Sequence, residues 1–91
     1  GSIEHILGET SSKEYSLNVG NLILLEIDIN GDSENFDFVE KKKHYSKSKY
    51  NEVEEFLKKY ESEEDWGAEQ IIKRSKELAN FIYKKNKNYS V

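Results

Sequence analysis

The chain has 91 residues, with 14 Lys and Arg against 18 Asp and Glu, a formal net charge of -4 and no cysteine. This length predicts one small domain that buries roughly two-thirds of its unfolded surface. The absence of cysteine excludes disulfides and cysteine-ligated zinc, which fits a cytoplasmic protein, and no apolar run approaches the ~20 residues that span a bilayer. The acidic charge argues against a wholly basic nucleic-acid-binding surface, although the lysine-rich stretch 41–49 follows an acidic stretch, 26–40.

Two strands are predicted first. Residues 2–7 are largely apolar and predict a short strand that carries Glu4 and His5 side by side. The polar stretch 8–20, with glycine at both ends, predicts a loop. The run NLILLEIDI at 21–29 predicts a second strand, which the turn sequence NGD at 30–32 ends. The initial Gly-Ser and the absence of methionine indicate a tag remnant at residues 1–2 and a chain taken from a longer protein.

Three helices follow in the prediction. Asp32 or Ser33 can cap the first, which ends near Lys43. Asn51 with Glu54 predicts the capping pair of a second helix, whose apolar stripe is Tyr50, Val53, Phe56, Leu57 and Tyr60. The start of the last helix is predicted at Gly67, which would be its N-cap, with Gln70 as the partner of the cap. Trp66 and Ile71 occupy the two positions of a hydrophobic staple. Its apolar period continues to Ile82, and residues 87–91 are expected to fray.

Glu4, His5 and Asn30 are the candidate residues for a metal-assisted reaction. A hairpin followed by a helix is a compact frame for one ion, and oxygen ligands with a lone imidazole favour Mg²⁺ or Mn²⁺. Glu4 and Asn30 are predicted as ligands, with Asn35 as an alternative to Asn30. His5 is suited to take a proton from water near pH 7, and Asn21 to brace the loop through backbone hydrogen bonds.

Several of these candidate residues can also be explained by a purely structural role. Neighbours on a regular strand point to opposite faces, so Glu4 and His5 can serve one ion only where the strand bulges or ends. His44 is expected to be solvated near a helix end. The run Lys41, Lys42 and Lys43 is either a solvated helix end or a DNA phosphate contact.

The remaining large side chains are given structural roles. Trp66 is expected in the core, because the staple pairing accounts for it without any ligand. Arg74, on the flank of the last helix, is expected to pair with acids or to pack its stem.

The ordered motifs resemble a known family. The resemblance lies in four ordered stretches, which are IEHILGE, VGNLILL, the Asn30 position with SENFDFVEKKKHYSKS, and DWGAEQIIKRSKELA. With these stretches the chain resembles the HNH nuclease module at the C-terminus of GmrSD-type, modification-dependent (type IV) restriction enzymes. The likeness spans about residues 3–83. Gly8 stands where the family usually has proline, and Ile23 replaces a common threonine.

The resemblance implies an α+β fold with a ββα-metal (HNH) finger at residues 3–46 and two packed C-terminal helices in a helical extension at 47–86. It implies a DNA endonuclease module that follows a nucleotide-dependent, ParB-like domain of the same parent protein. One alternative is a catalytically inactive DNA-binding or subunit-docking module that keeps the HNH frame, and another is a generic helical interaction domain.

Overall fold

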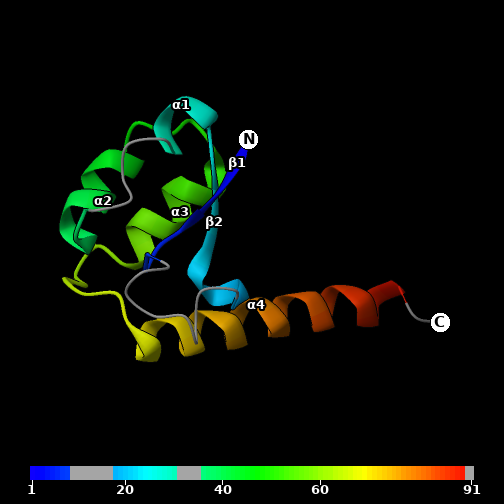
Figure 1. Cartoon of the computed structure of the whole chain (residues 1–91). Helices are drawn as coiled ribbons and strands as arrows, with labels where there is room; N and C mark the ends of the chain where they lie inside the picture. The colour runs from blue at the N-terminus through cyan, green and yellow to red at the C-terminus, as the bar shows by residue number, and fades with distance from the viewer. Residues whose placement is uncertain (9–17, 31–35, 90–91) are drawn as a thin grey trace.

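The computed structural model describes residues 1–8, 18–30 and 36–89, with side chains up to residue 84. This part of the chain is α+β, with one two-stranded antiparallel sheet, a 3-10 turn and four helices (Figure 1). The elements in chain order are β1 (Ser2–His5), η1 (Val19–Asn21), β2 (Leu22–Leu25), α1 (Ile27–Asn30), α2 (Phe38–Tyr45), α3 (Asn51–Lys59) and α4 (Ala68–Tyr89). Among the described helices, none is long and apolar enough to cross a membrane.

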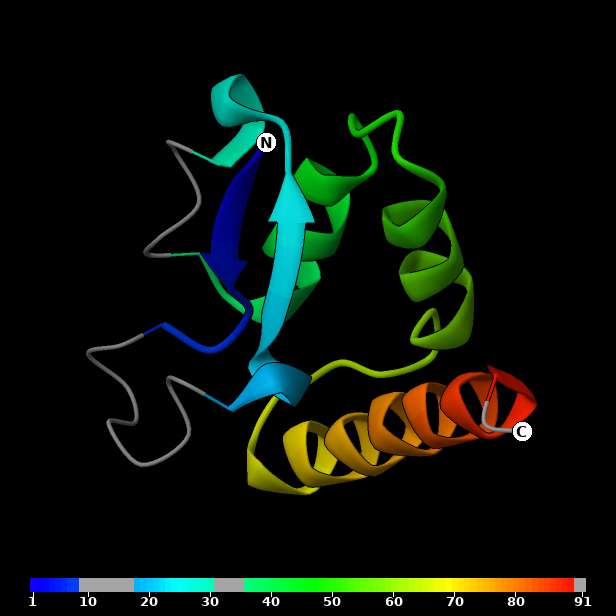
Figure 2. The same ribbon diagram turned by 90° about the vertical axis from the view of Figure 1, so that its right-hand side faces the viewer.

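The hairpin of β1 and β2 carries the candidate site. Its register pairs Ser2 with Leu25 at one end and His5 with Leu22 at the other. Side chains alternate, so that Ile23 and Leu25 are buried while Leu24 is 44% exposed. Figures 1 and 2 show α2 and α3 on one side of the hairpin, and α4 crossing the end of it where η1 lies.

The second strand is shorter than predicted. The strand expected at 21–29 ends at Leu25, and residues 27–30 form the helical turn α1, in which the backbone N–H groups of Ile29 and Asn30 both donate to the carbonyl of Glu26. The ladder between β1 and β2 ends at the pair Ser2 and Leu25. The β-branched residues of this stretch therefore lack the ladder that would keep them extended.

Two predicted helix starts were wrong. The predicted caps Asp32 and Ser33 lie outside the described residues, and α2 begins at Phe38 with Asp37 as its N-cap, whose carboxylate accepts from the backbone N–H of Glu40 at 2.8 Å. In α3, Tyr50 is the N-cap without a side-chain cap bond, so Asn51 is the first helical residue rather than a cap.

The predicted stripe of α3 is confirmed. Val53, Phe56 and Tyr60 are buried, and Tyr50 and Leu57 pack against the core. The rings of Phe56, Tyr60 and Trp66 lie within 5.3 Å of one another, and Phe38 lies 5.1 Å from Trp66. The core of the described structure therefore includes an aromatic cluster between α2, α3 and the start of α4.

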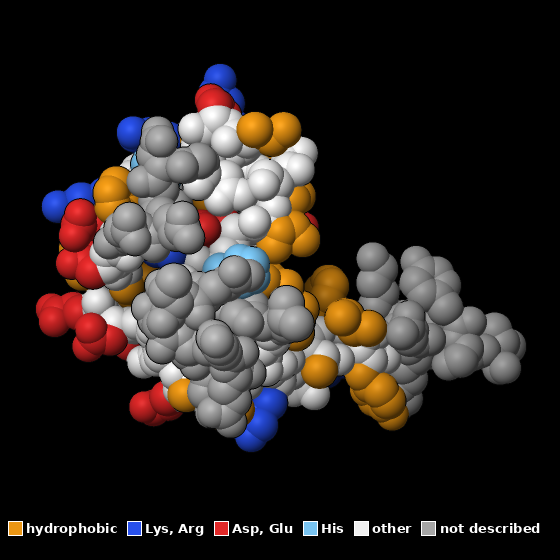
Figure 3. All heavy atoms as spheres, in the orientation of Figure 1, with side chains coloured by type: hydrophobic (Ala, Val, Ile, Leu, Met, Phe, Trp, Pro, Cys, Tyr) orange, Lys and Arg blue, Asp and Glu red, His pale blue; other side chains and the backbone are white. Residues whose placement is uncertain are grey.

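The start of α4 is as predicted, whereas its far half is not. The backbone N–H of Gly67 donates to Gln70 Oε1 at 3.0 Å, and Trp66 and Ile71 are both buried. The apolar period continues beyond the body of the domain, so that Phe81 is 66% exposed and Ile82 55% exposed. Figure 3 shows hydrophobic side chains along this projecting half. The helix continues to Tyr89, into the stretch where fraying is predicted.

Candidate active site at the end of β1

Glu4 and His5 are the last two residues of β1. Glu4 faces the core and is 7% exposed, while His5 is half-buried. They pair with Ile23 and Leu22 of β2, so the hairpin fixes both backbones. The carboxylate and the imidazole therefore start from opposite faces of the sheet at the point where the strand ends.

The carboxylate of Glu4 is held by α2. The Tyr45 hydroxyl donates to Glu4 Oε2 at 3.0 Å, and the Lys41 ammonium lies 3.8 Å from the same oxygen. Burial raises the pKa of Tyr45, and the charge of Glu4 raises this pKa further. The phenol therefore stays protonated and remains a hydrogen-bond donor to the carboxylate.

Lys41 is not where a DNA-contacting lysine would lie. It is 1% exposed, and its ammonium donates to the carbonyls of His5 at 2.9 Å and Ile6 at 2.8 Å. The predicted phosphate contact is therefore wrong for Lys41, which faces the interior. A stripe of Phe38, Lys41 and Tyr45, all buried, follows i, i+3 and i+7 on α2. That spacing is a sequence signal for an inward-facing lysine, whereas the composition of the run Lys41, Lys42 and Lys43 does not separate the three residues.

Asn21 has the bracing role predicted for it. Its side chain is fully buried; Oδ1 accepts from the backbone N–H of Leu7 at 2.7 Å, and Nδ2 donates to the Leu7 carbonyl at 3.0 Å. The Asn21 carbonyl also accepts from the N–H of Ile6 at 2.9 Å. These three bonds hold the chain that leaves β1 against η1.

Asn30 lies at the other end of β1. It closes α1, and its amide nitrogen donates to Ser2 Oγ at 2.6 Å and to the Ile3 carbonyl at 3.1 Å. These bonds tie Asn30 to the start of the strand that carries Glu4. The alternative ligand, Asn35, lies outside the described residues.

The other two lysines of the run point elsewhere. Lys42 donates to the carbonyls of Tyr60 at 3.1 Å and Glu61 at 3.2 Å, and also to that of Glu63, so it ties α2 to the connection before α4. Lys43 is exposed.

His44 is less solvated than predicted. It is half-buried, its Nε2 lies within hydrogen-bond distance of the Ile29 carbonyl, and its ring makes an edge contact with Phe36 at 5.7 Å. These contacts tie α2 to α1.

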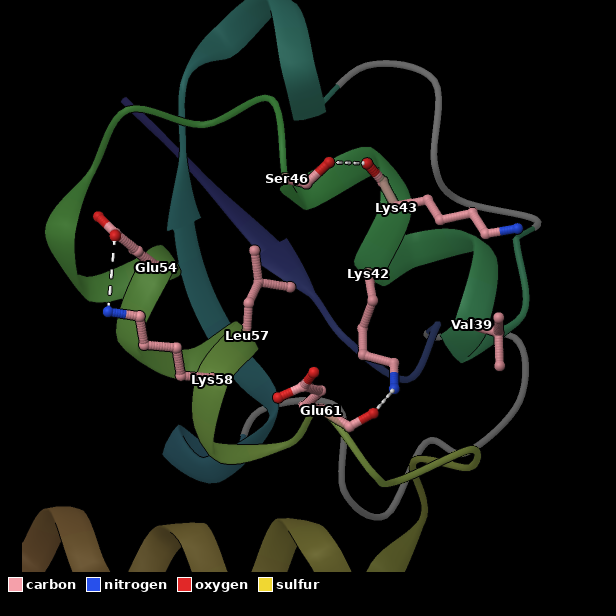
Figure 4. Close-up of a pocket in the computed structure, with 8 residues that line it drawn as sticks. All are labelled: Val39, Lys42, Lys43, Ser46, Glu54, Leu57, Lys58 and Glu61. Atoms are coloured by element: carbon pink, nitrogen blue, oxygen red, sulfur yellow. Dashed lines mark hydrogen bonds and ion pairs between the residues drawn. The ribbon is translucent and has the colours of Figure 1, made fainter.

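A groove of about 510 Å³ lies between α2 and α3 (Figure 4). Its walls include the apolar side chains of Val39 and Leu57, with Lys43 at its rim and the ion pair of Lys58 with Glu54, 3.7 Å long. Neither Glu4 nor His5 lines it. The groove is therefore separate from the candidate active site.

Arg74 braces the hairpin from α4. Its Nη1 donates to the carbonyls of Gly20 at 3.0 Å and Leu22 at 2.7 Å, and its guanidinium carbon lies 5.1 Å from the centre of the Phe56 ring. Burial lowers the pKa of Arg74, although nearby groups oppose this. The predicted structural role is confirmed, but the partners of the guanidinium in these bonds are carbonyls rather than acids.

The donor chemistry at the end of β1 suits a hard divalent ion only in part. A carboxylate, an amide oxygen and an imidazole are acceptable ligands for Mg²⁺ or Mn²⁺. The described residues contain no group of three His, Cys, Asp or Glu that could hold a metal ion. A ligand set at this end of β1 therefore needs a further oxygen ligand, whereas the predicted ligand Asn30 lies at the other end of the strand, bonded to Ser2 and Ile3.

The described structure is thus a small α+β domain in which a buried carboxylate and a histidine lie side by side at the end of the first strand of a short hairpin. A family model describing the C-terminal domain of GmrSD restriction endonucleases matches residues 2–81. The chain belongs to this family. Neither the curated proteins nor the solved structures gave a match.

Proposed function

We propose that the chain is a metal-dependent DNA endonuclease module of the HNH type, part of a larger restriction enzyme, with His5 as general base. The family match carries this proposal, because it spans residues 2–81 and includes Glu4, His5, Asn21 and Asn30. The position of Glu4 and His5 at the end of β1 supports it. Such a ββα-metal finger would consist of β1, β2 and α2.

The proposed reaction is hydrolysis of a DNA phosphodiester. His5 takes a proton from water, and the water oxygen forms a bond to phosphorus. The bond from phosphorus to the 3′-oxygen breaks, and the leaving oxygen takes a proton from solvent, which gives a 3′-hydroxyl and a 5′-phosphate. A neutral imidazole is suited to this proton transfer near pH 7.

Glu4 and Asn30 are the proposed ligands of a divalent ion, Mg²⁺ or Mn²⁺, with Asn35 as the rival of Asn30. When bound, the ion would supply charge compensation at the phosphate. Glu4 is anchored by Tyr45 and Lys41, so its carboxylate is held in one orientation. Asn30 already uses its amide nitrogen at Ser2 and Ile3, which leaves its oxygen as the ligand atom.

The DNA partner and the parent enzyme complete the proposal. Lys43 is the proposed phosphate contact, since Lys41 and Lys42 donate to backbone carbonyls. Sequence or modification specificity would come from the remainder of a cytoplasmic parent protein, including a nucleotide-dependent, ParB-like domain.

The test is nicking of supercoiled plasmid by the whole enzyme that carries this domain, with Mg²⁺ or Mn²⁺. His5→Ala should reduce the rate on the order of a hundred- to ten-thousand-fold while the domain stays folded. His44→Ala is the matched control, because it removes the only other histidine. Equal cleavage by His5→Ala and wild type would show that His5 is not the base.

The ligand assignment is tested by calorimetric titration of Mn²⁺. Glu4→Gln and Asn30→Ala should each weaken binding, and Asn35→Ala should weaken it less. A larger loss in Asn35→Ala than in Asn30→Ala would transfer the ligand role to Asn35. Unchanged binding in all three variants would remove the metal from this site.

A further inference from the structure

One ammonium group holds the end of β1. Lys41 Nζ donates to the carbonyls of two consecutive residues, His5 at 2.9 Å and Ile6 at 2.8 Å. On a regular strand, successive carbonyls point in opposite directions. A single donor can reach both only where the chain departs from the extended form, and β1 ends at His5, with a bend at the next two residues.

The same ammonium also faces the side chain of Glu4, at 3.8 Å. Lys41 thus contacts three consecutive residues, which include both members of the proposed reactive pair. One helical turn further along α2, Tyr45 donates to Glu4 Oε2 at 3.0 Å. One face of α2 therefore sets both the carboxylate of Glu4 and the peptide that follows His5.

A lysine is a costly way to fill this space. Lys41 is 1% exposed, and a buried ammonium must recover its lost hydration through directed hydrogen bonds. An apolar side chain of similar length would pack as well, but it would not fix the direction of two carbonyls. The bonds of Lys41 thus define a local backbone shape, in addition to any contribution to packing.

We propose that Lys41 is a positioning residue for His5. By holding the bend at the end of β1, it sets the imidazole relative to the carboxylate of Glu4, which lies on the other face of the strand. This inference rests on the proposed function for the role of His5, but the placement itself can be measured without any cleavage.

The first experiment compares histidine ring signals in ¹H–¹³C NMR spectra of the wild-type chain and Lys41→Met at one pH. Methionine has a similar length and no donor. The chain has only two histidines, so His44 is an internal reference for the overall fold. We expect the His5 signal to shift or split while the His44 signal stays in place.

Lys42→Met is the matched control. It is the same substitution on the next residue of α2, and it also removes an ammonium that donates to carbonyls, but those belong to residues 60, 61 and 63 rather than to β1. It should leave the His5 signal unchanged. If Lys41→Met does not fold, Lys41→Gln replaces it, because glutamine keeps an amide donor and lacks the charge.

The second experiment measures cleavage by the whole enzyme with the same variants. Misplacement of a reactive group should lower kcat by roughly tenfold to a hundredfold in Lys41→Met, with little change in KM. A folded variant with unchanged His5 signal and kcat would overturn the proposal. So would equal displacement of both histidine signals, because that would show a general structural role. If His5→Ala still cleaves while Lys41→Met moves the His5 signal, the base assignment fails and the placement by Lys41 stands.

Discussion

Gly20 is the position where α4 approaches the hairpin most closely, and Gly20→Ala tests that contact. An added Cβ would lie 2.1 Å from the carbonyl oxygen of Ile71 and 2.8 Å from the backbone nitrogen of Ser75. Both atoms belong to the α4 backbone, so no side-chain rotation can relieve the clash. Since carbon contacts are normally about 3.5 Å or longer, η1 and α4 must separate by more than about 1 Å.

That separation also affects Arg74. Its bonds to the carbonyls of Gly20 and Leu22 are 3.0 and 2.7 Å long, and 1 Å more would exceed hydrogen-bond distance. Overpacking costs about 1–3 kcal/mol, and a hydrogen bond to a charged group contributes about 1.5–3 kcal/mol. We therefore expect Gly20→Ala to lower the free energy of unfolding by about 3 kcal/mol, or Tm by at least about 10 °C in a domain of this size.

Urea unfolding followed by fluorescence of Trp66 measures this loss, because Trp66 is the single tryptophan and is 5% exposed. Gly67→Ala is the control: its added Cβ meets only Gln70 Oε1, at 3.8 Å. It should cost no more than about 1 kcal/mol through the weaker N-cap. A Gly20→Ala protein within about 0.5 kcal/mol of wild type would refute the close packing of α4 on η1.

Three further perturbations test the supports of the hairpin. Arg74→Met keeps the stem but removes both bonds to carbonyls, and should lower the free energy of unfolding by about 2 kcal/mol in urea titrations; no change would show that the guanidinium is dispensable. Glu26 accepts from Ser48 Oγ at 2.6 Å and from the Lys49 N–H at 2.9 Å, and these bonds lower its pKa below 4.5. The ionised Glu26 carboxylate therefore stabilises the fold fully above pH 4.5, and this stabilisation is lost as the pH falls through the lowered pKa. Glu26→Gln should make the free energy of unfolding depend less on pH on the acid side, and parallel curves for the variant and wild type would contradict this. Asn21→Ala leaves both backbone groups it now pairs unsatisfied and should cost about 1–3 kcal/mol by thermal unfolding, whereas a cost near zero would mean that water replaces the amide.

Features that depend on neighbouring residues could be predicted from the sequence. The Gly67–Gln70 cap and the buried pair Trp66 and Ile71 follow from spacing alone, and the structure has them. The brace by Asn21 was predictable because a short amide near a strand start commonly bonds the backbone. The placement of Glu4 and His5 on the first strand was also predicted correctly.

Features that depend on distant partners could not be predicted. The strand expected at 21–29 ends at Leu25, the last residue of β2 that pairs with β1, and the register of the two strands is a tertiary property. The buried contact of Tyr45 with Glu4 joins residues 41 positions apart. Likewise, the exposed far half of α4 has the same apolar period as the packed half, so periodicity alone could not separate them.

The lysine run shows why a cluster in the sequence need not be a cluster in space. Successive residues on an α-helix point about 100° apart, and the three ammonium groups of the run accordingly have three different surroundings. Lys41 bonds the end of β1, Lys42 bonds the connection before α4, and Lys43 is exposed. Three phosphate contacts would give a log–log salt slope of about -2.7 in DNA binding, whereas one gives about -0.9. In the proposed function the run therefore supplies one phosphate contact, while Lys41 and Lys42 hold the end of β1 and the connection before α4.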